Sequence, residues 1–189
     1  MKTKKTALFL STALAISMLA IPAQAASVTT AGSAGTTPVT VTAAATTFDV
    51  TVPTDIPLKV NADGSVTTPS NVKLVNNSGG PVKVSKISMK NNTWKLTDYN
   101  NGDRAKLAAA GVDSKKLGLS LTAGGNAVVT SKDGDQDPTM DPTKWVVKGK
   151  GSDTNELAVS VGAIASAVST EITAGETAAN VIFTLAWNN

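Results

Sequence analysis

Cysteine and histidine are both absent from the 189 residues of this chain. They are the commonest transition-metal ligands, and histidine is the usual base of a catalytic triad, so their absence excludes the most frequent sites of both kinds. Without disulfides, a secreted domain must fold by burying a core alone, which about 160 residues allow. A secreted protein without cysteine also fits a single-membrane bacterium better than a eukaryotic secretory pathway.

The sequence also lacks the motifs of common enzymes. It has no nucleophile elbow, no phosphate-binding glycine loop and no acid/base pair, so we predict that it is not an enzyme. Aromatic residues make up only 4% of the chain. Trp94, Tyr99, Trp145 and Trp187 would suffice for a sugar-stacking platform, but two of them fall on strand faces that we expect to be buried. Core packing is therefore the favoured interpretation of the aromatic residues.

The first 25 residues have the pattern of a secretory signal peptide. Lys2, Lys4 and Lys5 precede an apolar run over residues 7–21, and Ala23-Gln24-Ala25 forms a small-residue cleavage site. The run is shorter than the roughly 20 residues that a spanning helix needs, which argues against a membrane anchor. No cysteine for a lipid anchor follows it. We therefore predict cleavage after Ala25 and a secreted protein, extracellular or associated with the cell surface.

The formal net charge of +3 belongs to this signal. Three of the 17 basic residues lie in it, which leaves 14 basic side chains against 14 acidic ones in the mature chain. Because nucleic-acid binding depends on neutralising phosphates, a near-neutral surface argues against a nucleic-acid partner.

Residues 26–47 are rich in alanine, threonine, serine and glycine, and they have too little apolar surface in their first half to order themselves. We expect a flexible N-terminal arm here, followed by a domain over residues 48–189. Val39 and Val41 share one face of the arm, whereas Phe48 begins the opposite parity, which predicts a bulge or a junction between strands within residues 44–47. Extended at about 3.3 Å per residue, the arm would reach roughly 70 Å.

Short strand patterns at regular spacing predict an all-β fold, an antiparallel two-sheet β-sandwich or jelly roll with one short inserted helix. At its centre we expect a strand, a tight connection over residues 76–81 and a second strand, in the manner of a hairpin. In that second strand the apolar parity changes after Val84, which predicts a bulge at Ser85-Lys86. Residues 103–111 predict the helix, and residues 51–63 with two prolines predict a sheet edge.

The last strand has the clearest pattern. Large side chains alternate with smaller ones over residues 181–187, so we expect Phe183 and Trp187 to be buried in the core. Residues 157–167 keep one parity and predict another long strand, although a helix beginning at Gly162 is the alternative.

Asp133, Asp135 and Asp137 define an acidic loop. Their alternation can turn three carboxylates toward one calcium ion, the only cofactor that the sequence suggests. The EF-hand pattern fails, because Pro138 occupies the glycine position and Lys144 the position of the bidentate glutamate. We therefore favour a solvated acidic loop without an ion.

Two runs resemble the TasA/camelysin-like secreted proteins of Gram-positive bacteria: Leu-Val-Asn-Asn-Ser-Gly-Gly-Pro-Val-Lys-Val at residues 74–84 and Val-Ile-Phe-Thr-Leu-Ala-Trp-Asn at residues 181–188. The resemblance implies a jelly roll that builds extracellular matrix fibres, in which the arm of one subunit completes the sheet of the next. The helical segment is much shorter here than in that family. A second resemblance, to WxL cell-wall-binding domains, rests on Thr93-Trp94-Lys95-Leu96, but their C-terminal Trp-x-Leu is missing.

Two functions follow as expectations. In the first, the protein is a secreted structural subunit whose partner is another copy of itself, with Val39 and Val41 as assembly residues. In the second, it is a monomeric module that binds a cell-wall polymer or glycan. The sequence leaves open whether the arm pairs with its own domain or with another copy.

Overall fold

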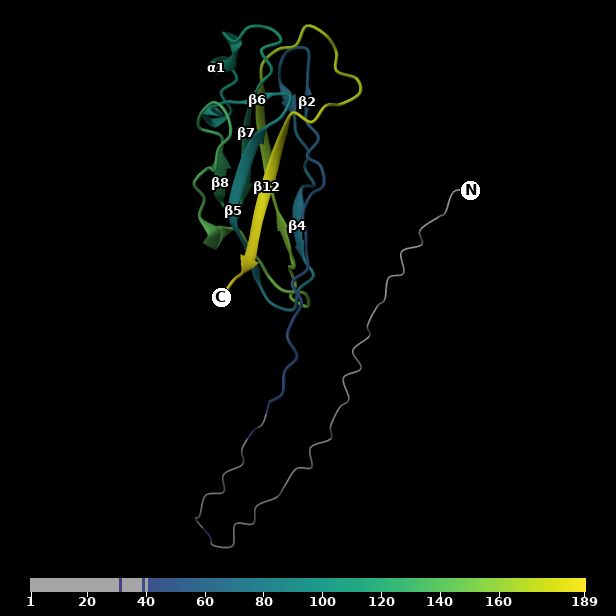
Figure 1. Ribbon diagram of the computed structural model, residues 1–189, viewed down its shortest axis with the longest axis vertical. Coiled ribbons are helices and arrows are strands. Elements are labelled where there is room, and N and C mark those ends of the chain that lie inside the picture. Colours follow the sequence, from purple (N-terminus) through teal and green to yellow (C-terminus); the bar gives the residue numbers. More distant parts are fainter. Residues whose placement is uncertain (1–30, 32–38, 40) are drawn as a thin grey trace, which may run out of the picture. The chain divides into compact units, whose positions relative to one another are not determined.

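The computed structural model describes residues 31, 39 and 41–189. The predicted signal peptide lies outside the described residues, as does most of the first half of the arm. The chain divides into two units, Met1–Ala43 and Ala44–Asn189, and the second unit contains the strands (Figure 1). Within the described residues, no helix has the length and apolar character needed to cross a membrane.

Strands are the main regular elements of the second unit, and α1 (Ala105–Ala108) is the one α-helix among the described residues. The predicted all-β fold with a short inserted helix is therefore confirmed. In chain order the strands are β1 (Val50–Thr51), β2 (Lys59–Val60), β3 (Val66–Thr67), β4 (Lys73–Asn76), β5 (Val82–Asn91), β6 (Lys95–Leu96), β7 (Lys116–Ala123), β8 (Asn126–Val129), β9 (Val146–Val147), β10 (Glu156–Ala158), β11 (Ser160–Ala165) and β12 (Ala179–Trp187).

The strands form a sandwich around one core. One layer has the order β12-β5-β9, and the other combines β1-β4-β10 with β11-β7-β6, where β8 also pairs with β7. These two parts continue into one another, because β10 and β11 are separated only by Val159, whose N–H donates to the Val72 carbonyl at 2.9 Å. Every strand pair except β6–β7 is antiparallel. Leu74 and Leu121 from one layer share the core with residues of β5 from the other.

The predicted bulge in β5 is confirmed. Thr184 of β12 pairs with Lys86 and Leu185 pairs with Val84, so Ser85 is the extra residue, and its hydroxyl donates to the Thr184 carbonyl. The bulge restores the inward direction of the apolar side chains after the parity change. As a result, four residues of β5 are fully buried: Val82, Val84, Ile87 and Met89.

The predicted pairing of the two central strands is wrong. β4 pairs with β1 and β10, whereas β5 pairs with β12 and β9, so the connection between them crosses from one layer to the other. The cause is Asn76, whose buried side chain donates to the carbonyls of Gly80, Val147 and Lys148 and accepts from the Ser78 N–H. These bonds hold the turn residues against β9 rather than in a hairpin.

Several other predictions agree with the structure. β1 and β2 lie at an edge and flank the two prolines, and Gly64 N–H donates to the Asn61 carbonyl in the turn between β2 and β3. The helix is present but shorter than expected, with the Asp103 carboxylate accepting from the Ala105 N–H. The long strand over residues 157–167 is divided at Val159 and does not turn into a helix at Gly162. By contrast, the bulge or strand junction predicted within residues 44–47 is wrong, because residues 39 and 41–49 belong to no strand.

Candidate assembly edge at strand β12

Strand β12 has a partner on one side only. It pairs over its full length with β5, and no other described strand pairs with it (Figure 1). Its sequence, Ala-Asn-Val-Ile-Phe-Thr-Leu-Ala-Trp, contains no charged residue and no proline. Natural edge strands are usually protected by such residues or by being very short, as β1 and β2 are with two residues each. β12 is therefore an unprotected edge that another strand can extend.

The hydrogen-bonding groups that this edge presents follow from its register. The Asn188 N–H donates to the Pro81 carbonyl at 3.0 Å, so even-numbered residues of β12 direct their backbone groups toward β5. Consistently, the Met89 N–H, opposite Val181, points away from β12 and donates to Gln136. The backbone N–H and C=O groups at the free edge therefore belong to the odd-numbered residues: Val181, Phe183, Leu185 and Trp187.

The side chains of the same odd-numbered residues form a partly exposed apolar row. All four pack against the core, yet none reaches the full burial of their neighbours on β5. The expectation that Phe183 and Trp187 are buried is thus wrong in degree, although their face was predicted correctly. The reason is that β12 is the outermost strand of its layer, so no described strand pairs with its outer edge.

A second row of partly buried apolar residues comes from the first part of the domain. It lies on and between β1, β2 and β3, at the edge of the opposite layer, and consists of Val50, Val52, Ile56, Leu58, Val60 and Val66. The two rows meet at the end of β12, where the rings of Phe48 and Trp187 make an edge-to-face contact with centroids 5.0 Å apart. Apolar side chains at two edges of the core are therefore only partly buried.

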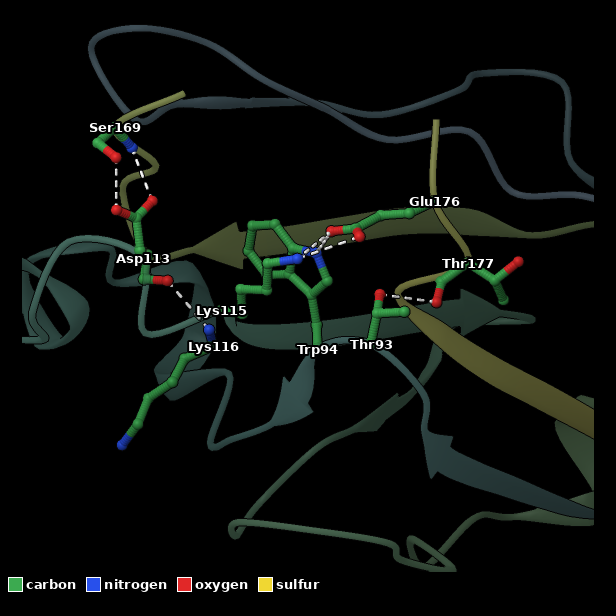
Figure 2. A network of polar contacts seen from close by, with 9 residues as sticks. Thr93, Trp94, Asp113, Lys115, Lys116, Ser169, Glu176 and Thr177 are labelled. Atoms are coloured by element: carbon green, nitrogen blue, oxygen red, sulfur yellow. Dashed lines mark hydrogen bonds and ion pairs between the residues drawn. The ribbon is translucent and has the colours of Figure 1, made fainter. Parts of the chain in front are cut away.

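The start of β12 is held by the connection that leads to it, a strap defined as residues 166–178 (Figure 2). The Glu176 carboxylate accepts from the Trp94 indole N–H at 2.6 Å and from Lys115 Nζ at 3.0 Å. The Asp113 carboxylate accepts from the N–H and hydroxyl of Ser169. Bonding by Lys115 and then Trp94 lowers the pKa of Glu176, and bonding by Ser169 lowers the pKa of Asp113. The strap therefore anchors the start of β12 through carboxylates that are ionised at neutral pH.

The acidic loop does not gather its carboxylates. Asp133 accepts from the Thr97 hydroxyl at 2.6 Å, Asp135 accepts from the Asn91 N–H at 2.8 Å, and Asp137 lies 2.9 Å from Lys86 Nζ. The pKa of Asp133 is lowered first by its bond from Thr97, and the pKa of Asp137 first by its bond from the Ser88 hydroxyl. Among the described residues, no three acidic side chains form a group suited to a metal ion.

The aromatic residues are distributed between core and edge. Trp145 and Trp94 are 0% and 5% exposed, and the Trp145 indole N–H donates to Asn126 at 3.0 Å. Tyr99 and Trp187 are half-buried. The described residues therefore present no row of exposed aromatic rings of the kind that stacks on sugars.

The two assembly residues predicted from the sequence are exposed. Val39 and Val41 have 88% and 80% of their surface accessible. Sequence reasoning identified these residues but missed the free edge of β12, although the absence of charge and proline from its nine residues is a signal that the sequence contains.

Comparison with known proteins adds nothing further: no protein-family model, curated protein or solved structure matches the chain. The resemblances to the TasA/camelysin-like proteins and the WxL domains are neither supported nor refuted by these comparisons.

Proposed function

We propose that this protein is a secreted structural subunit that polymerises by strand donation, in which the arm of one copy pairs with the free edge of β12 in another. The observation that carries the proposal is the unpaired, uncharged edge of β12 with its row of partly exposed apolar side chains. An extended segment that adds to such an edge gains backbone hydrogen bonds and covers the exposed side chains. The role is structural rather than catalytic, with a second copy of the chain as the partner.

The arm has the composition that this role requires. Val39, Val41, Ala43 and Ala45 share one parity, which matches the alternation of β12. Val39 and Val41 are exposed and free to be buried by a partner. The predicted signal peptide would place this assembly outside the cell, where fibres of the resembled family are built.

The alternative, a monomeric cell-wall- or glycan-binding module, requires a different surface. Stacking on a sugar needs exposed aromatic rings, whereas Trp94 and Trp145 lie in the core. The carboxylates of the acidic loop pair with lysines on neighbouring strands, as Asp137 does with Lys86 on β5. No feature of the described residues favours this alternative over strand donation.

The test compares four proteins by size-exclusion chromatography and negative-stain microscopy. Protein starting at Ala26 is expected to form filaments or oligomers that resist mild denaturant, and protein starting at Phe48 is expected to be monomeric. Val41→Asp should abolish assembly, because it places a charge on the face that must be buried. Thr42→Asp is the matched control, since its side chain lies on the opposite face and should leave assembly intact.

Monomeric behaviour of all four proteins at high concentration would contradict strand donation. Equal effects of Val41→Asp and Thr42→Asp would show that charge, rather than burial of one face, controls any association.

A further inference from the structure

The arm is attached to the domain at the C-terminal end of β12. Phe48 packs its ring against Trp187, the last residue of β12, and the Thr46 hydroxyl accepts from the Gly79 N–H at 3.1 Å. β1 then starts at the same end, because Val50 pairs with Asn76, beside the crossing that leads to β5. The base of the arm, at Thr46, therefore lies at one end of the free edge.

This position determines the direction of any strand that the arm adds. If the arm folds back onto β12 of its own chain, both segments run from N- to C-terminus toward the end of β12 at Trp187. The two segments are then parallel. Two copies that exchange arms reciprocally bring two such ends together and also produce parallel pairing. Antiparallel pairing arises when the arm enters a second copy at the N-terminal end of that copy's β12.

From this geometry, and resting on the function proposed above, we infer that the arm runs antiparallel to β12 of the next copy, which joins the subunits head to tail. Antiparallel pairs are more stable per residue than parallel ones, and β5 already pairs antiparallel with both of its neighbours. Ala44 and Ala45 belong to the same unit as β12, yet they are exposed and in no strand, so the domain does not hold them for pairing with itself. A head-to-tail contact that does not close produces an open filament.

The alternation of both segments restricts the register. The odd-numbered arm residues must face the core together with the odd-numbered residues of β12, and Thr46 is tied to its own domain. Both conditions hold in a register that sets small arm residues beside large side chains near the entry point. This register pairs Ala45 with Val181, Ala43 with Phe183, Val41 with Leu185 and Val39 with Trp187.

The same arrangement brings opposite ends of two domains together. Val112 and Ile172 are 60% and 40% exposed, and the Asp113–Ser169 bonds place their segments side by side at the N-terminal end of β12. Phe48, at the other end, is 44% exposed. Head-to-tail joining places these apolar side chains at one interface, so the arm pairing and the end contact support the same orientation.

Disulfide trapping tests the direction cleanly, because the chain has no cysteine of its own. In the inferred pairing, even-numbered residues of β12 and the arm residues opposite them form the non-hydrogen-bonded pairs. Their Cα atoms are about 4.5 Å apart, which a disulfide can bridge. Full-length mature protein carrying Ala44→Cys is mixed with protein carrying Ile182→Cys or, separately, Ala186→Cys, and each mixture is oxidised mildly. Ser152→Cys, at an exposed loop position, measures random collision.

The inference predicts cross-linked pairs of Ala44→Cys with Ile182→Cys, well above the Ser152→Cys background, and only background cross-linking with Ala186→Cys. The reverse result would overturn the head-to-tail direction while leaving strand donation intact. Background cross-linking in both mixtures, from proteins that still form arm-dependent oligomers, would overturn β12 as the acceptor. If the mature protein forms no oligomers, the proposed function itself fails.

Discussion

Replacement of Asn76 by alanine is the most direct test of the crossing between the two layers. The Asn76 side chain is 0% exposed; it donates to the carbonyls of Gly80, Val147 and Lys148 at 2.9, 3.2 and 3.1 Å and accepts from Ser78 N at 2.9 Å. A buried hydrogen bond contributes about 0.5–1.5 kcal/mol net to the free energy of unfolding, and a buried polar group left without a partner costs more. The alanine variant should therefore lose about 2–4 kcal/mol of unfolding free energy.

That loss is large for a domain with about 5–15 kcal/mol of total stability, and it corresponds to a fall of about 6–12 °C in Tm. Urea unfolding followed by tryptophan fluorescence measures it, since Trp94 and Trp145 are buried. Protein starting at Phe48 is the appropriate background, because assembly does not then contribute to stability.

Asn77→Ala is the control for this experiment. Asn77 is exposed, and its amide makes only a 3.4 Å contact with the Thr51 hydroxyl, so its loss should cost no more than about 0.5 kcal/mol. If the Asn76 and Asn77 variants unfold with free energies that agree within about 0.5 kcal/mol, the amide network does not hold the crossing and the reasoning above is refuted.

Four further outcomes are expected. In the monomer, Phe183→Ala should lower the free energy of unfolding by less than the loss of about 3–5 kcal/mol that is typical of a fully buried aromatic residue, and in the assembled protein it should lower it by more. Ile182→Ala, on the outer face, is the control. Equal losses in the monomer and the assembled protein would place the arm elsewhere. Calorimetric titration of calcium into the acidic loop should show weak binding or none, and a micromolar site that raises Tm would contradict this. Because the folded-state pKa values of Glu176 and Asp113 are lowered, their contribution is present above about pH 4.5 and is lost as pH falls through those values; Glu176→Gln should flatten that acid dependence, and an unchanged pH profile of Tm would contradict it. N-terminal sequencing of extracellular protein should begin at Ala26, and full-length chain found only inside the cell would refute cleavage.

The strand pattern was largely predictable from local sequence. Side chains in a strand alternate between two faces, so a change of parity requires an extra residue, which the structure places at Ser85. The same alternation predicted β12 and the face on which Phe183 and Trp187 lie. Short strand patterns at regular spacing and one short helical segment were sufficient to predict the fold class.

Of the candidate assembly site, the arm residues could be predicted from the sequence, and the free edge of β12 could not. The exposed valines of the arm follow from composition, but whether a strand has one partner or two depends on where distant strands lie. The partial exposure of Phe183 arises because no described strand pairs with β12 on its outer side, and no local sequence pattern reveals that.

The sequence by itself determined the strands, the parity of their side chains and the bulge, because these depend on residues close together in the chain. The tertiary structure alone decided which strands pair. Turn residues such as Ser78 and Gly79 serve a hairpin and a crossing equally well, and the choice was made by bonds from Asn76 to carbonyls 71 and 72 residues away. It likewise decided that the carboxylates of the acidic loop meet separate donors on other strands, because spacing along a loop does not determine which side chains approach it from elsewhere.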